Sequence, residues 1–148
     1  MRILLADQDR ELMEFVKKGL THEGIVGDIV CDGQITFEMA SEGDHDAVLI
    51  ETVMPNLSGY DVLKKLRTQG SDVPLLIVTS KSQEKDKLHG LNNGVDNYIV
   101  KPFLLTEVVA RIRAVLRRTV KDGCKRSEAS VLRAVKLELF TNWAVFLP

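Results

Sequence analysis

The chain begins with ILLADQD at positions 3–9, where a short apolar run ends in three polar residues. Runs of this length and composition are typical of strands that are buried on both faces of a parallel sheet. Asp9 is a favourable helix N-cap, and apolar residues at helical spacing follow it as far as Leu20. The opening therefore predicts a buried strand followed by an amphipathic helix.

The same unit of strand and helix recurs as far as Arg118. Further strands are expected at 25–30, 47–50, 75–78 and 97–100, and further helices around 36–40, 62–66, 83–93 and 106–118. Five alternating units predict a doubly wound α/β fold, in which helices cover both faces of a five-stranded parallel sheet. The crossover connections should be right-handed.

Polar side chains follow the predicted strands at the points where they end. The polar residues at these points are Asp7, Gln8 and Asp9 after the first strand, Glu51 and Thr52 after the third, Thr79 and Ser80 after the fourth, and Lys101 after the fifth. Ligands of doubly wound sheets bind at the carboxyl ends of the strands, so we expect these side chains to lie together. A carboxylate, a hydroxyl and an ammonium group at one edge are suited to binding a phosphate group.

Length and composition indicate one compact domain with a small appendage. The chain has 148 residues and a net charge of -1, which does not require a nucleic acid or a membrane as partner. Cys31 and Cys124 form neither a disulfide framework nor a metal-ligand cluster. No apolar segment approaches the roughly 20 residues of a membrane span, and no signal peptide is evident, so we expect a cytoplasmic protein.

The pattern changes after Arg118. Residues 119–130 are mostly polar and basic and indicate a linker, and the β-rich runs 131–140 and 143–147 flank the turn-forming pair Thr141-Asn142. Residues 131–148 therefore predict a short C-terminal β-hairpin. A lone hairpin is marginally stable in water, so it must pair with other structure or be poorly ordered.

Five motifs in this order resemble the receiver domains of two-component response regulators. They are ILLADQD at 3–9, MPNLSGY at 54–60, VTS at 78–80, GVDNY at 94–98 and KPF at 101–103. The resemblance covers residues 1–118 and implies a flavodoxin-like, or CheY-like, (βα)5 fold. It also implies a signalling module that is not an enzyme and that takes part in a phosphorelay with a histidine kinase.

The family's phosphorylation chemistry depends on two groups of acidic residues. In the family, a pair of acids after the first strand holds Mg²⁺, and an Asp at the end of the third strand accepts the phosphoryl group. The resemblance places Asp7 and Gln8 at the acidic pair and Glu51 at the phosphoacceptor position. The predicted metal ligand is therefore Asp7 alone, no cofactor is certain, and any Mg²⁺ site should be weak.

Four further residues complete the site that the resemblance implies. Thr79 and Lys101 would contact a phosphoryl group, and Tyr98 occupies the position of an aromatic side chain whose rotamer reports the switch. Pro102 follows Lys101, where the family often has a cis peptide bond.

Gln8 and Glu51 both depart from the family pattern in ways that should impair phosphorylation. A carboxamide supplies a dipole in place of a charge, and Mg²⁺ prefers carboxylate oxygens. The extra methylene of Glu51 moves its oxygens by roughly an ångström, and misplacements of that size can cost about a hundredfold in rate. The sequence therefore predicts impaired or absent aspartyl phosphorylation.

Glu51 leaves several interpretations open. Its carboxylate could reach Lys101, or Thr79 through a hydrogen bond, and so hold an active-like arrangement without phosphate. Equally, a Glu51–Lys101 contact could be a residual ion pair that only neutralises the lysine. A receiver phosphorylated on Glu51 or on another acid is one alternative function. A flavodoxin-like flavin carrier is another, although Asp7-Gln8-Asp9 replaces the Gly- and Ser-rich phosphate loop it would need.

The end of the predicted domain resembles the OmpR/PhoB-like subfamily, whose receivers dimerise through their fourth helix, fifth strand and fifth helix. The charged residues that match this dimer face are Lys87, Asp96, Glu107, Arg111 and Arg113. In that subfamily a linker leads to a winged-helix DNA-binding domain, and residues 131–148 resemble its opening strands. DNA binding and control of transcription would belong to a longer parent protein, because a recognition helix is absent from these residues.

Overall fold

The computed structural model describes residues 1–80, 95 and 97–122. Its elements follow one another in the order β1 (Arg2–Ala6), α1 (Arg10–His22), β2 (Val26–Val30), α2 (Gly33–Ser41), β3 (Ala47–Glu51), α3 (Gly59–Thr68), β4 (Leu75–Thr79), β5 (Asn97–Val100) and α5 (Leu105–Asp122). The predicted helix at 83–93 and the predicted hairpin at 131–148 lie outside the described residues.

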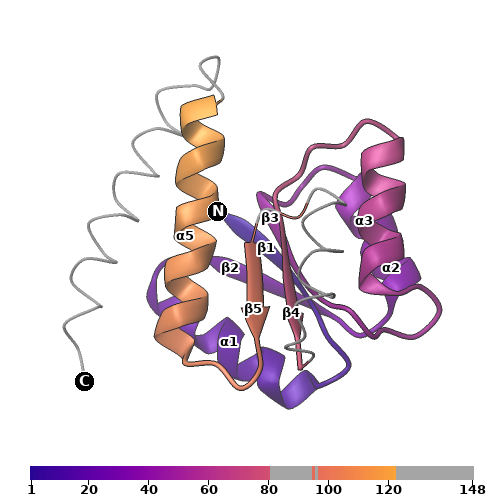
Figure 1. Cartoon of the computed structure of the whole chain (residues 1–148). Coiled ribbons are helices and arrows are strands. Elements are labelled where there is room, and N and C mark those ends of the chain that lie inside the picture. The colour runs from indigo at the N-terminus through magenta and orange to yellow at the C-terminus, as the bar shows by residue number, and fades with distance from the viewer. Residues whose placement is uncertain (81–94, 96, 123–148) are drawn as a thin grey trace.

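The strands form one five-stranded parallel sheet in the order β2-β1-β3-β4-β5. The chain moves outward from β1 to β2, then crosses to β3 and continues outward to β5, so β1 and β3 lie at the reversal of strand order. Helices α1 and α5 cover one face, and α2 and α3 cover the other (Figure 1). The prediction of a doubly wound parallel sheet is confirmed.

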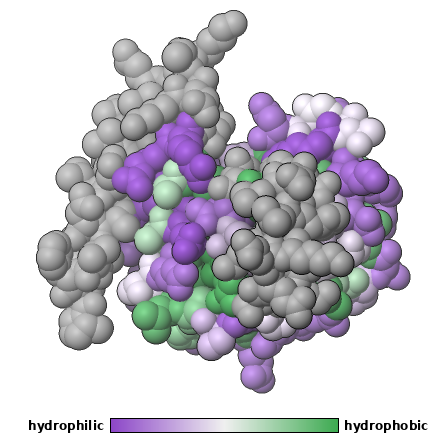
Figure 2. Space-filling model, in the orientation of Figure 1, coloured by the Kyte–Doolittle hydropathy of each residue, from purple (hydrophilic) through white to green (hydrophobic). Residues whose placement is uncertain are grey.

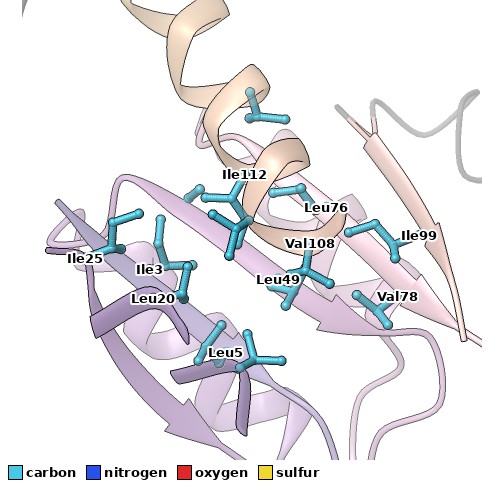
Figure 3. Close-up of a cluster of buried hydrophobic side chains, with 14 of the residues drawn as sticks. Ile3, Leu5, Leu20, Ile25, Leu49, Leu76, Val78, Ile99, Val108 and Ile112 are labelled. Atoms are coloured by element: carbon cyan, nitrogen blue, oxygen red, sulfur yellow. The ribbon is translucent and has the colours of Figure 1, made fainter. Parts of the chain in front are cut away.

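Alternation along the central strands divides the hydrophobic core into two layers. Successive side chains of a strand point to opposite faces of its sheet. Ile3 and Leu5 of β1 therefore pack toward α1 and α5, whereas Leu4 and Ala6 pack toward α2 and α3. Figure 3 shows the first of these layers, in which side chains of the sheet meet those of α1 and α5. Burial on both faces explains why the central strands are almost continuously apolar.

The helices begin at the residue types that favour capping. The side chain of Asp9 accepts a hydrogen bond from the backbone N–H of Leu12, as predicted, and Asp32 and Ser58 cap α2 and α3 in the same way. Helix α5 continues to Asp122, four residues into the predicted linker. The sequence contains no Gly or Pro between Arg118 and Gly123, so nothing in this stretch interrupts the helical hydrogen bonds.

The face of the described residues that Figure 2 shows is mostly hydrophilic. Hydrophilic side chains predominate over the coloured surface in Figure 2, and apolar ones gather toward its lower end, where α1 and the start of α5 lie. Among residues 1–80, 95 and 97–122, no helix combines the length and the apolar character required to cross a bilayer.

The loop between β3 and α3 is held firmly against the start of α2. The backbone N–H of Gly33 donates to the carbonyl oxygen of Pro55 at 3.0 Å, and the side-chain amide of Asn56 donates to Asp32. A Cβ atom at Gly33 would lie 1.7 Å from the carbonyl oxygen of Leu57. The close approach of the loop to α2 therefore requires glycine at this position, and it holds the part of the loop at Pro55, Asn56 and Leu57.

We expect Gly33→Ala to destabilise the domain by about 1–3 kcal/mol or more, because the added methyl group must displace backbone atoms. Urea unfolding followed by circular dichroism measures the change. Gly27→Ala is the matched control, since its Cβ would meet only movable side-chain atoms, the nearest being Leu5 Cδ1 at 3.0 Å. Equal unfolding midpoints for the two variants would contradict the close approach at Gly33.

Candidate functional site

The carboxyl ends of the parallel strands bring the predicted site residues together. Asp7 directly follows β1, Glu51 is the last residue of β3, Thr79 is the last residue of β4, and Lys101 directly follows β5. Asp7, Glu51 and Thr79 are buried, with exposed fractions of 2%, 8% and 1%. A cluster of charged and hydroxyl groups at a buried edge requires mutual pairing, and the contacts of these side chains show how that pairing is achieved.

The ammonium group of Lys101 lies between the two carboxylates. Its Nζ atom is 2.8 Å from Oδ2 of Asp7 and 2.8 Å from Oε2 of Glu51. Burial by itself would lower the pKa of Lys101, but the hydrogen bonds and charges of Asp7 and Glu51 outweigh it and raise the pKa above the ordinary value. The lysine therefore remains a cation and ties together the ends of β1, β3 and β5.

The second carboxylate oxygen of Glu51 is bound by its neighbour in the chain. Glu51 Oε1 accepts hydrogen bonds from the backbone N–H and from the hydroxyl group of Thr52, each at 3.0 Å. The Thr52 hydroxyl oxygen is in turn 2.9 Å from the hydroxyl oxygen of Thr79. Glu51 is thus linked to Thr79 by a hydrogen-bonded chain that passes through Thr52.

Thr52 is a member of this site to which the sequence analysis assigned no role. Its side chain is buried, with 4% of the residue exposed. The available signal was a hydroxyl residue directly after Glu51, at the end of an apolar strand. Backbone alternation alone would direct Thr52 away from the side chain of Glu51, so only the folded geometry reveals the contact.

Gln8 turns its side-chain nitrogen toward the loop that follows β3. The amide Nε2 donates a hydrogen bond to the carbonyl oxygen of Val53 at 2.8 Å. The remaining oxygen of the neighbouring carboxylate, Asp7 Oδ1, accepts from the backbone N–H of Asp9 at 2.9 Å. Each of these oxygens therefore already has a hydrogen-bond donor from the chain itself.

These residues fit Mg²⁺ poorly. The ion prefers carboxylate and carbonyl oxygens in near-octahedral geometry. Here Lys101 binds one oxygen of Asp7 and one of Glu51, and the Gln8 amide binds the carbonyl oxygen of Val53. In the part of the chain that the structure describes, no group of three or more His, Cys, Asp and Glu side chains is arranged to hold a metal ion. Positively polarised hydrogens therefore compete with a cation for the oxygens that it would need.

Tyr98 lies on β5, and Pro102 follows Lys101 directly after the same strand. Tyr98 is half-buried on β5 and packs against the core layer on the side of α2 and α3. The Lys101–Pro102 peptide bond is cis. The backbone N–H of Lys101 donates to the carbonyl oxygen of Thr79 at 2.8 Å, which joins the ends of β4 and β5.

The predicted dimer face is described only in part. Lys87 and Asp96 lie outside the described residues. Glu107 and Arg111 are partly exposed on α5 and are 3.2 Å apart, and Arg111 also donates to the side-chain oxygen of Asn97 at 2.8 Å. Asn97 thus provides an uncharged acceptor for the arginine of α5.

Arg113 does not belong to this exposed face, contrary to the prediction. It is 2% exposed, and its Nη2 atom is 2.7 Å from Oε2 of Glu23, which caps the end of α1. The reason is helical spacing, because Arg113 shares the stripe of Val109 and Leu116, both buried. Burial lowers the pKa of Arg113, and the charge of Glu23 opposes that effect. Arg113 thus joins α5 to α1.

Comparisons with known proteins agree with this geometry. Residues 3–113 match the family model of the response regulator receiver domain. The chain is 37% identical over 142 residues to the response regulator MprA of Mycobacterium leprae (strain TN), which covers 96% of this chain and 62% of that protein. The chain therefore spans less than two thirds of the length of this relative.

Solved structures of receiver domains have the same fold. The receiver domain of the Francisella response regulator 1452 superposes with a TM-score of 0.76 at 30% identity, covering 80% of this chain and 98% of that one. TrrA of Thermotoga maritima, in complex with Mg²⁺ and BeF, superposes with a TM-score of 0.69 at 26% identity, covering 77% of this chain and 97% of that one.

The receiver family predicted from the five motifs is therefore confirmed, and the similarity to MprA supports its placement beside the OmpR/PhoB-like subfamily. The family model spans most of the chain, and the acid, hydroxyl and lysine at the carboxyl edge of the sheet occupy the positions that the motifs indicated. This chain belongs to the response regulator receiver domains of two-component signalling.

Proposed function

We propose that this chain is a receiver module that dimerises without aspartyl phosphorylation and that controls transcription as part of a longer protein. Receiver domains are generally signalling modules without enzymatic activity, and they typically receive their signal from histidine kinases. The observation that carries the proposal is the 2.8 Å ion pair between Glu51 at the phosphoacceptor position and Lys101. Lys101 already has an anionic partner in Glu51, so the pocket does not require a phosphoryl group to supply one.

Two features of the pocket oppose phosphoryl transfer to Glu51. Both of its oxygens are engaged, Oε2 by Lys101 and Oε1 by Thr52, so attack on a phosphoryl group would have to compete with these contacts. Transfer also relies on a metal ion to neutralise developing charge, and the pocket fits Mg²⁺ poorly. The two handicaps are independent, and they favour impaired phosphorylation over the alternative in which Glu51 is the acceptor.

Dimerisation is proposed through the exposed part of β5 and α5 together with the segment at 83–93. Glu107, Arg111 and Asn97 form a connected polar group on this surface, with contacts of 3.2 and 2.8 Å. Exposed ion pairs contribute only about 0–1 kcal/mol each, so this group would fix the register of a dimer more than its affinity. Transcription control is proposed because MprA is a response regulator and is longer than this chain.

The first test compares dimerisation of the native chain with that of Glu51→Asp and of a Gln8→Asp/Glu51→Asp double variant. We expect sedimentation equilibrium to show the same dimer fraction for the native chain with and without beryllofluoride and Mg²⁺. The double variant should respond to the analogue, because it regains a shorter acid and a second carboxylate. In a separate experiment, the native chain is incubated with acetyl phosphate and Mg²⁺, and its mass is measured to detect covalent phosphorylation. An added phosphoryl mass on it would contradict the proposal.

The second test is Glu51→Gln, which should destabilise the fold by about 1–3 kcal/mol because a buried donor loses its acceptor. If the amide oxygen faces Lys101, the NH₂ group meets the backbone N–H of Thr52. If the amide is reversed, the NH₂ group meets the ammonium. Urea unfolding at neutral pH measures the loss. Glu14→Gln is the control, since Glu14 is exposed and lies 3.9 Å from Arg10. An equal loss in both variants would argue against the paired pocket.

The third test is Gln8→Asp, which we expect to create a Mg²⁺ site. The substitution adds a second carboxylate beside Asp7 and releases the carbonyl oxygen of Val53 from its hydrogen bond. Isothermal titration calorimetry with MgCl₂ should give saturable binding for the variant and a much weaker response for the native chain. Gln34→Asp on α2 adds the same charge outside the pocket and should behave like the native chain. Equal Mg²⁺ affinity of the native chain and Gln8→Asp would refute the poor fit.

A further inference from the structure

Thr52 stands between the acid at the phosphoacceptor position and the hydroxyl group at the end of β4. Its N–H and O–H groups bind the same oxygen, Glu51 Oε1, and its hydroxyl oxygen is 2.9 Å from that of Thr79. Thr52 and Thr79 are both buried, with 4% and 1% of each residue exposed, so solvent competes little for these contacts. The described contacts of the Glu51 carboxylate toward β4 all pass through Thr52.

The chemistry of the groups fixes the direction of this hydrogen-bonded chain. A carboxylate oxygen can only accept, so the single hydroxyl hydrogen of Thr52 is directed to Glu51. The contact between the two hydroxyl groups must then use the hydrogen of Thr79, which Thr79 donates to Thr52. The Thr79 hydrogen is therefore committed inside the pocket, and an incoming anion would have to compete with Thr52 for it.

We propose that Thr52 is a positioning residue, which transmits the charge of Glu51 to Thr79 and so holds the Thr79 side chain in one rotamer without phosphate. A β-branched side chain is stiff about χ1, and rotation of Thr52 would exchange its hydroxyl for its methyl group. The carboxylate of Glu51 favours the Thr52 rotamer in which the hydroxyl group faces Oε1. In that rotamer the Thr52 hydroxyl oxygen also accepts the hydrogen bond from Thr79. This inference rests on the proposed function only in treating Thr79 as the hydroxyl group that the switch uses.

Nuclear magnetic resonance of the full chain tests the inference through the three-bond couplings to the methyl carbon of Thr79, which report its χ1 angle. The native chain should give couplings of a single rotamer. Thr52→Val keeps the shape of the side chain but removes the hydroxyl group, so we expect rotamer-averaged couplings at Thr79. Thr52→Ser restores a hydroxyl group and should restore the single rotamer.

Thr36→Val is the matched control, because Thr36 is 0% exposed and its hydroxyl group donates to the carbonyl oxygen of Asp32 at 2.7 Å. This variant also loses a buried hydroxyl hydrogen bond, yet it should leave the couplings of Thr79 unchanged. Unchanged couplings in Thr52→Val, or an equal change in Thr36→Val, would overturn the inference. Averaged couplings in the native chain would overturn it even if Thr52→Val does not fold.

The couplings are recorded at a protein concentration at which the chain is monomeric, so they do not depend on dimerisation. If the native chain does not dimerise without phosphate but shows a single Thr79 rotamer, the result counts against the proposed function alone. If the native chain dimerises without phosphate but gives rotamer-averaged Thr79 couplings, the result counts against the role of Thr52 alone.

Discussion

The architecture of the site depends on one ammonium group placed between two carboxylates. Lys101 Nζ is 2.8 Å from both Asp7 and Glu51, at an edge where the two acids are 2% and 8% exposed. Without the cation, two like charges would face each other in a poorly solvated position, and removing one member of such a buried group commonly costs about 3–5 kcal/mol. The lysine also joins the ends of β1, β3 and β5. The same two contacts therefore balance the charge of the pocket and hold the strand ends together.

The oxygens of this pocket are bound by N–H and O–H groups of the protein itself, in place of a metal ion. Lys101 and the Gln8 amide bind oxygens that suit a divalent ion, and Thr52 binds Oε1 of Glu51. Receiver domains generally bind Mg²⁺ at an acidic pocket. Gln8 and Glu51, at positions where the resemblance implies aspartates, each supply one of these contacts.

The supporting structure places these groups and limits their movement. The parallel sheet brings strand ends that are distant in sequence to one edge, and the loop after β3 is held against α2 by Gly33 and Asn56. On the opposite side of the sheet, Arg113 and Glu23 join α5 to α1 at 2.7 Å. A buried pair of this kind is weak evidence for stability, but it does define how α5 is rotated about its axis.

The amino-acid sequence by itself determined the strands, the start of α1 and the four residues at the carboxyl edge, because apolar periodicity, capping and parallel strand order are local or topological properties. Asp9, Glu51 and Lys101 were placed correctly for that reason. Only the tertiary structure decided that Thr52 mediates between Glu51 and Thr79, and that Arg113 pairs with Glu23. Those contacts depend on side-chain rotamers and on how separate elements pack, and no pattern within a single element encodes either.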